Sequence, residues 1–155
     1  AATAAARSGE PASSVAARTE VACEALSTWF AVDTLEYLRR GGRVGAAQAW
    51  LGSALKIKPI LTISGEITPI ERVRTSRRAF ERLLEFAAEL RDKGSTAWIV
   101  QHIQADEQAA RLAAAAGEII GTEPVFVSEL GPVIGTHVGP GLLGIGGLPP
   151  ALLAS

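Results

Sequence analysis

The chain has 155 residues, of which 48% are hydrophobic and 20% are charged, and its formal net charge is −1. This length and composition predict a single globular domain with a sizeable core, and they argue against a nucleic-acid-binding protein, which would be strongly basic. The single cysteine, Cys23, cannot form an internal disulfide, which fits a cytoplasmic location.

The first third of the chain predicts helices around one strand. Residues 1–26 are rich in alanine and helical in composition. Residues 28–32 carry bulky and β-branched side chains and predict a short buried strand. A short helix then runs to Arg40, where Gly41 is expected to provide a left-handed stop.

A second short helix is predicted at residues 46–55, which are apolar nearly all round and should therefore be buried. The runs 57–63 and 66–74 read as two strands joined by a tight turn at Ser64 and Gly65, which predicts a β-hairpin.

The clearest element is an amphipathic helix over residues 75–93, because apolar side chains recur there every three or four positions. Strands alternating with helices, plus one hairpin, predict an α/β fold with a mixed sheet flanked by helices. The remaining elements are a strand at 96–103, a helix at 106–117, a strand at 124–130, and a glycine-rich loop at 131–147 containing a short strand near 142–145.

The candidate chemistry centres on His137, which lies among glycines and prolines in residues 131–141. Glycine lets a backbone approach a ligand closely, and the amide groups of such a turn can bind an anion. A structural turn with a solvated histidine is an equally good interpretation. No other histidine, cysteine or acid lies at coordinating spacing, so no metal site is predicted. The other histidine, His102, is expected to be a surface or strand-end residue.

Two further features carry positive charge. Gly41 to Gly45 lacks the Gly-Lys-Ser/Thr ending of a nucleotide-binding loop, so Arg43 is instead expected to face an acidic group or backbone carbonyls. An arginine run lies at the start of the long helix, where the helix dipole disfavours cations, so an acidic partner surface is one interpretation and a solvated face is the other. The run comprises Arg72, Arg74, Arg77, Arg78 and Arg82.

Four segments resemble the second domain of the DegV family. They are 32–45 (VDTLEYLRRGGRVG), 51–61 (LGSALKIKPIL), 72–75 (RVRT) and 129–141 (ELGPVIGTHVGPG). They occur in the family's order, and the resemblance covers roughly residues 28–146.

The resemblance implies a two-domain protein that holds one long-chain fatty acid and presents it to a bacterial fatty acid kinase, so the chain is expected to be a carrier and not an enzyme. It implies that His137 binds the fatty-acid carboxylate, with Thr136 and Gly135 assisting, and that no cofactor is needed. Arg43 is expected to support the site, and the arginine run Arg72, Arg74, Arg77 and Arg78 to contact the kinase. Small and apolar residues are expected to line the acyl tunnel: Ala47, Trp50, Leu51 and Ala54.

By the same resemblance, residues 1–27 are expected to join two domains and residues 28–155 to form the carboxy-terminal one. The chain contains no methionine, so we expect natural sequence upstream, including the amino-terminal domain that completes the site. Two other functions remain open: an enzyme acting on a small anionic substrate at residues 135–141, and an interaction domain without a ligand.

Overall fold

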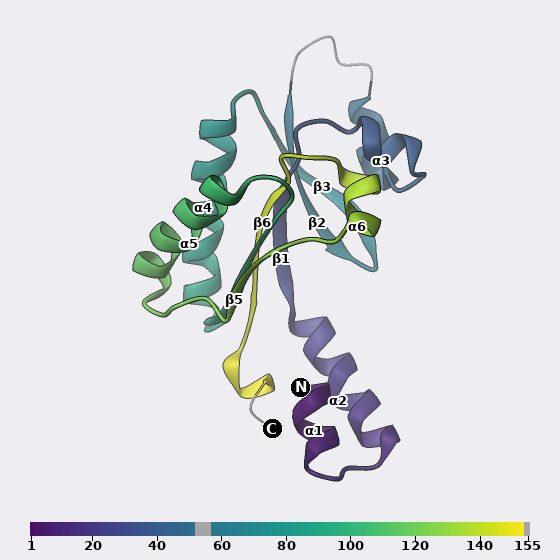
Figure 1. The fold of residues 1–155 in the computed structure, drawn as a ribbon, viewed down its shortest axis with the longest axis vertical. Helices are drawn as coiled ribbons and strands as arrows, with labels where there is room; N and C mark the ends of the chain where they lie inside the picture. Colours follow the sequence, from purple (N-terminus) through teal and green to yellow (C-terminus); the bar gives the residue numbers. More distant parts are fainter. Residues whose placement is uncertain (52–56, 154–155) are drawn as a thin grey trace.

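The computed structural model describes residues 1–51 and 57–153 and contains a six-stranded mixed sheet with helices on both faces (Figure 1). The strand order is β3-β2-β1-β6-β4-β5, and all neighbours are antiparallel except β4 and β5. This arrangement confirms the predicted α/β class and the hairpin. The strands are β1 (Ser27–Ala31), β2 (Lys58–Ser64), β3 (Glu66–Val73), β4 (Ala97–His102), β5 (Phe126–Glu129) and β6 (Leu143–Leu148).

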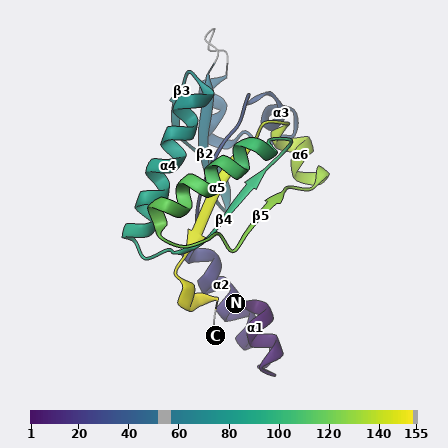
Figure 2. The ribbon, with the colours of Figure 1, turned by 60° about the vertical axis from the view of Figure 1, so that its left-hand side comes forward.

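Helices α4 (Ser76–Asp92) and α5 (Asp106–Ile120) lie side by side over one face of the sheet (Figures 1 and 2). Helices α3 (Glu36–Arg40) and α6 (Pro132–Val138) pack together on the opposite side. Helices α1 (Ala2–Arg7) and α2 (Ala12–Ala25) project away from the sheet, near the short 3₁₀ helix η2 (Pro150–Leu152).

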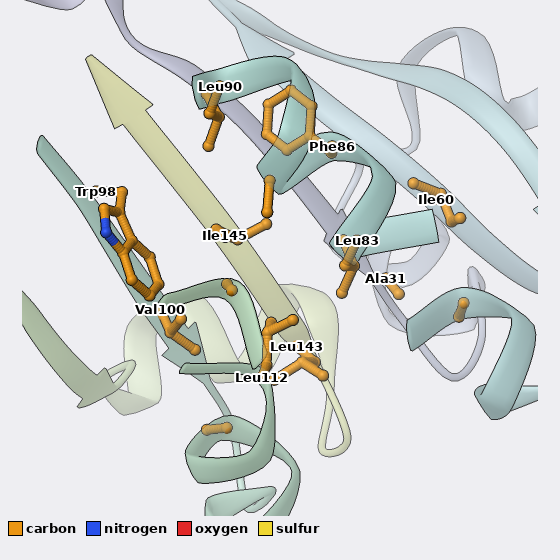
Figure 3. Close-up of a cluster of buried hydrophobic side chains, with 14 of the residues drawn as sticks. Ala31, Ile60, Leu83, Phe86, Leu90, Trp98, Val100, Leu112, Leu143 and Ile145 are labelled. Atoms are coloured by element: carbon orange, nitrogen blue, oxygen red, sulfur yellow. The ribbon is translucent and has the colours of Figure 1, made fainter. Parts of the chain in front are cut away.

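The core between the sheet and helices α4 and α5 follows the predicted amphipathic pattern (Figure 3). Leu83, Ala87 and Leu90 of α4 are fully buried, as their spacing predicts. Trp98 of β4 is also fully buried, and its indole N–H donates to the Thr122 hydroxyl at 3.1 Å. This apolar layer joins α4 and α5 to one face of the sheet.

Helix α4 has a side-chain cap that can be tested. The Thr75 hydroxyl accepts a hydrogen bond from the Arg78 amide at 3.1 Å. We expect Thr75→Ala to lower the free energy of unfolding by about 1 kcal/mol, because the amide loses its partner. Chemical denaturation measures this change, and Ser76→Ala, one residue into the helix, is the matched control. A loss for Ser76→Ala as large as for Thr75→Ala would contradict the role of the cap.

Strand β6 corrects the prediction of a glycine-rich loop over residues 131–147. The strand is longer than predicted and lies in the middle of the sheet, between β1 and β4. Its glycines fit because neighbouring atoms approach closely: a Cβ on Gly144 would lie 3.0 Å from the Cβ of Phe30, and one on Gly147 would lie 2.7 Å from the Ser95 carbonyl oxygen. The glycines that suggested a loop therefore allow close strand packing.

Two other local predictions are wrong. Gly41 does not provide the left-handed stop of α3, because its φ is −79°; Gly42, with φ of +66°, has the left-handed conformation. Residues 46–55 do not form a helix buried all round. A 3₁₀ helix, η1 (Gly45–Trp50), is present instead, and of its alanines only Ala47 is buried. The rest of that segment, 52–55, lies outside the described residues.

Candidate functional site

An apolar cavity of about 310 Å³ lies on the face of the sheet opposite α4 and α5. We call it the sheet cavity. Its volume is at the lower end of the range found for small-molecule sites. Strands, the β2–β3 hairpin and α6 all contribute to its wall, which includes Phe30, Ile67, Ile99, Val133, Val138 and Leu142. Such a wall is suited to an alkyl chain.

His137 lines this cavity from helix α6. The helix begins at Pro132, whose missing N–H costs nothing at the first helical position. Two amides of the glycine-rich segment already have partners: that of Gly139 donates to the Gly135 carbonyl at 2.9 Å, and that of Gly141 to the Ile103 carbonyl at 2.8 Å. The anion-binding role of this turn stays a prediction, and the imidazole side chain, which lines the cavity, is the candidate ligand-binding group.

The imidazole of His137 packs directly against Gly41. A Cβ on Gly41 would lie 2.2 Å from Nδ1 of His137, which is closer than any side chain could remain. Gly41 follows α3, and α3 packs against α6. Gly41 thus has a packing role that the sequence did not reveal.

Hydrogen bonds from Arg39 and then Arg40 lower the pKa of the Glu36 carboxyl to about 2, so this carboxylate stays charged and keeps its arginine partners at neutral pH.

Within residues 1–51 and 57–153, two fully buried side-chain nitrogen or oxygen atoms lack a hydrogen-bond partner, Nδ1 of His137 and Oγ1 of Thr28. Both residues line the sheet cavity. Buried polar atoms in native proteins nearly always have partners, so unsatisfied ones call for an explanation. The two atoms themselves have almost no accessible surface, so the residues line the cavity through their other atoms.

Arg43 also lines the sheet cavity, and it is exposed. The structure therefore brings together Arg43 and His137, which the sequence analysis had linked only through the family resemblance. Thr136 is exposed, and its hydroxyl donates to the Val133 carbonyl at 2.8 Å. Gly135 is half-buried within α6, and a Cβ built on it would lie 3.9 Å from Cδ1 of Ile103. Their roles in binding a carboxylate remain predictions.

Three of the residues predicted to line an acyl tunnel belong to an apolar cluster that also contains the cavity residues Phe30 and Leu142. Ala47 is fully buried in this cluster, and Trp50 and Leu51 pack against it. These three residues are not among those that line the sheet cavity. Ala54 lies outside the described residues. The part of the cavity wall that sequence reasoning missed includes residues of β1, β4 and β6, and the alternating glycines Gly144 and Gly146 were the signal that pointed to it.

The arginine run is largely paired with acids of its own helix. Arg77 donates to Glu81 at 3.0 Å, and Arg78 donates to Glu85 at 3.1 Å. Hydrogen bonds from Arg77 and then Arg78 lower the pKa of Glu81. Because these arginines already pair with acids, their position at the start of a helix is weaker support for an acidic partner surface. Arg74 is exposed. Arg72 lies over the ring of Trp50, with 5.3 Å between its guanidinium carbon and the ring centroid.

A larger hollow of about 900 Å³, which we call the helix cleft, lies beside α4 and α5. Charged residues of both signs line it, including Asp33, Lys58, Glu81 and Arg111. Asp33 forms an ion pair with Lys58, and Arg111 lies over the ring of Phe80. The mixed lining suits an alkyl chain less well than the sheet cavity does.

His102 is a strand-end residue as predicted, but it is buried and not on the surface. Its Nδ1 accepts a hydrogen bond from the Ala105 amide at 3.3 Å, so it supports the turn before α5. Among the described residues, no group of three or more histidine, cysteine, aspartate or glutamate side chains is placed to hold a metal ion. None of the helices in those residues is both long and apolar enough to cross a membrane.

Comparisons with known proteins point to one family. The family described as "Uncharacterised protein, DegV family" matches residues 1–149. A DegV domain-containing protein of Streptomyces coelicolor is 49% identical over 121 residues, which cover 77% of this chain and 43% of the relative.

Two solved structures are also similar. A fatty-acid-binding DegV family protein from Streptococcus agalactiae gives a TM-score of 0.84 at 28% identity, with 96% of this chain and 53% of that chain covered. The fatty-acid-binding protein DegV from Bacillus subtilis gives a TM-score of 0.76 at 33% identity, with coverage of 95% and 54%. The chain therefore spans about half the length of these relatives.

Proposed function

The chain belongs to the DegV family, and we propose that it forms one wall of a long-chain fatty-acid site whose acyl chain occupies the sheet cavity. The observation that carries this proposal is the combination of an apolar trough with a histidine and an arginine on its wall. A carboxylate beside apolar groups is costly unless it is hydrogen-bonded or paired. His137 donates a hydrogen bond to the carboxylate through its ring N–H, and Arg43 supplies a positive charge. The apolar residues of the wall contact the alkyl chain.

The chain's residues act by binding and presenting the ligand. Phe30, Ile99 and Leu142 shield the alkyl chain from water, while His137 orients the carboxylate away from the sheet. In this proposal Thr136 and Gly135 support the histidine. A kinase then phosphorylates the exposed carboxylate, and the acyl phosphate serves phospholipid synthesis. The arginines Arg72, Arg74, Arg77 and Arg78 form the surface that contacts the kinase, of which Arg74 is the most readily available.

A second part of the protein completes the site in this proposal. The chain spans about half the length of its relatives, and residues beside the cavity are strongly exposed. Val133 of α6 is 76% exposed and Ile134 is 45% exposed, although both line the sheet cavity. An apolar helix face beside a ligand site is stabilised when another domain covers it. We assign that role to the amino-terminal domain.

Mass spectrometry of extracted lipid tests this proposal. The intact gene product and this segment are purified in parallel under identical conditions. We expect a stoichiometric long-chain fatty acid in the intact protein and much less in the segment, because half of the site is missing from it. An intact protein that carries no fatty acid, and binds none when stearic acid is added, would overturn the proposal.

A further inference from the structure

The helix cleft beside α4 and α5 is a second cavity, and the fatty-acid proposal assigns it no ligand. Its volume of about 900 Å³ falls within the range of small-molecule sites. Ala31, Leu83 and Leu143 line it and also belong to the core between the sheet and the two helices (Figure 3). The cleft therefore extends from the surface down to buried apolar side chains.

The floor of the cleft lies where two strands of the same direction end. Strand β6 is antiparallel to both β1 and β4, so these two strands run the same way. Leu143, at the start of β6, pairs with Ala31 of β1 and with His102 of β4, which places the carboxyl ends of the two strands side by side around it. After β1 the chain continues to α3 on one side of the sheet, and after β4 to α5 on the other (Figure 1). Ligands of open α/β sheets bind in crevices at the carboxyl ends of strands where the connections part in this way.

One positive charge of the cleft has no acidic partner. The other two cations of its wall are in ion pairs, Lys58 with Asp33 and Arg77 with Glu81. Arg111 of α5 instead lies over the ring of Phe80, with 5.5 Å between its guanidinium carbon and the ring centroid. Within residues 1–51 and 57–153, no carboxylate forms an ion pair with Arg111. The cleft thus favours an anionic ligand, with Arg111 as its partner.

The rest of the wall matches a flat polar ring better than an alkyl chain. Gln104 and Gln108 both line the cleft, and a side-chain amide donates and accepts at once, as the edges of nucleobases require. Phe80 adds an aromatic surface on which a ring can stack. In the part of the chain that the structure describes, Gln104 is the one residue other than glycine with a positive φ, +49°, and Oε1 of Glu129 accepts a hydrogen bond from its amide at 3.0 Å. Strained backbone of this kind is concentrated at functional sites.

We propose that the helix cleft binds a nucleoside phosphate, with Arg111 contacting the phosphate and the two glutamines contacting the edge of the base. The apolar floor covers the base, and the phosphate lies toward solvent, where Arg111 is exposed. A guanidinium and a phosphate form a strong and geometrically specific pair. Of the described residues, none lines both the helix cleft and the sheet cavity, so this site is separate from the fatty-acid site.

Isothermal titration of the intact protein with adenosine monophosphate tests the proposal, with adenosine and inorganic phosphate as partial ligands. We expect saturable one-to-one binding of the monophosphate. Adenosine should bind about 10- to 100-fold more weakly, because the contact with a charged phosphate is missing. Arg111→Gln should lower the affinity for the monophosphate by a similar factor and leave that for adenosine nearly unchanged. Gln108→Ala should weaken both ligands.

Arg91→Gln is the matched control, because Arg91 is an exposed arginine near the end of α4 that lines neither cavity. It removes the same charge and should leave both affinities unchanged. The proposal is wrong if the monophosphate does not bind, if inorganic phosphate binds as tightly, if both arginine variants weaken binding equally, or if stearic acid displaces the monophosphate. Stearic acid binding is measured on the same samples, and its absence would count against the proposed function and not against this inference.

Discussion

Replacing His137 with alanine should lower the affinity of the intact protein for stearic acid about 10- to 100-fold, because a hydrogen bond to a charged group contributes about 1.5–3 kcal/mol. The imidazole lines the sheet cavity and would donate to the carboxylate there. Thr136→Ala should cost much less, because the Thr136 hydroxyl already donates to the Val133 carbonyl. Displacement of a labelled fatty acid measures both affinities.

Thermal unfolding of each variant serves as the control for folding. An unchanged affinity in His137→Ala, with an unfolding temperature like that of the wild type, would show that the carboxylate binds elsewhere. An equal loss in both variants would assign the binding to the whole helix and not to the imidazole.

Gly41→Ala should reduce fatty-acid affinity nearly as much, about tenfold or more, although Gly41 contributes no side chain to the cavity. The added methyl would lie 2.2 Å from Nδ1 of His137, so the ring must leave its position. Backbone strain does not explain this effect, because φ of Gly41 is −79°, which alanine adopts readily. Gly41 is thus a positioning residue for the histidine.

The double variant separates positioning from general damage. In a His137→Ala background, Gly41→Ala should change the affinity little, because the displaced ring is already gone. Gly131→Ala is the matched control, since a Cβ there meets no atom within 4 Å and φ is −67°. Additive losses in the double variant would contradict the account of Gly41.

The sequence correctly predicted helix α4 and the β2–β3 hairpin, because neighbouring residues in the chain determine both. Helix α4 carries its apolar residues at helical spacing and a threonine cap, and both signals agree with the structure. The hairpin likewise follows from Gly65, which has φ of +74° in the turn. These features need no knowledge of distant parts of the chain.

Glycine misled the prediction where its reason is a distant contact. The signals for α6 were present, with Pro132 at the start and Gly139 after the end, but the density of glycines favoured a loop. Position 144 in the strand is a glycine because Phe30 of β1 lies close against it. Gly41 is a glycine because His137, far along the chain, needs the space.

The glycine- and proline-rich setting of His137, and then the family resemblance, singled out this residue, but the residues around it could not be ordered in space. Thr28 gave no signal, because a threonine in a strand is ordinary in sequence. Its position on the cavity wall becomes visible only when β1 and β6 are placed together. The acyl-tunnel role predicted for Ala47, Trp50 and Leu51 stays a prediction, because apolar composition alone does not distinguish a ligand wall from a core.

Photocrosslinking locates the acyl chain most directly. The intact protein is loaded with a stearic acid analogue that carries a diazirine near mid-chain, irradiated, digested and sequenced by mass spectrometry. We predict crosslinks to β1 and β6, around Thr28 and Gly146, and their loss when excess stearic acid competes. Crosslinks to α4 and α5 would instead place the chain in the helix cleft and contradict the assignment of the sheet cavity.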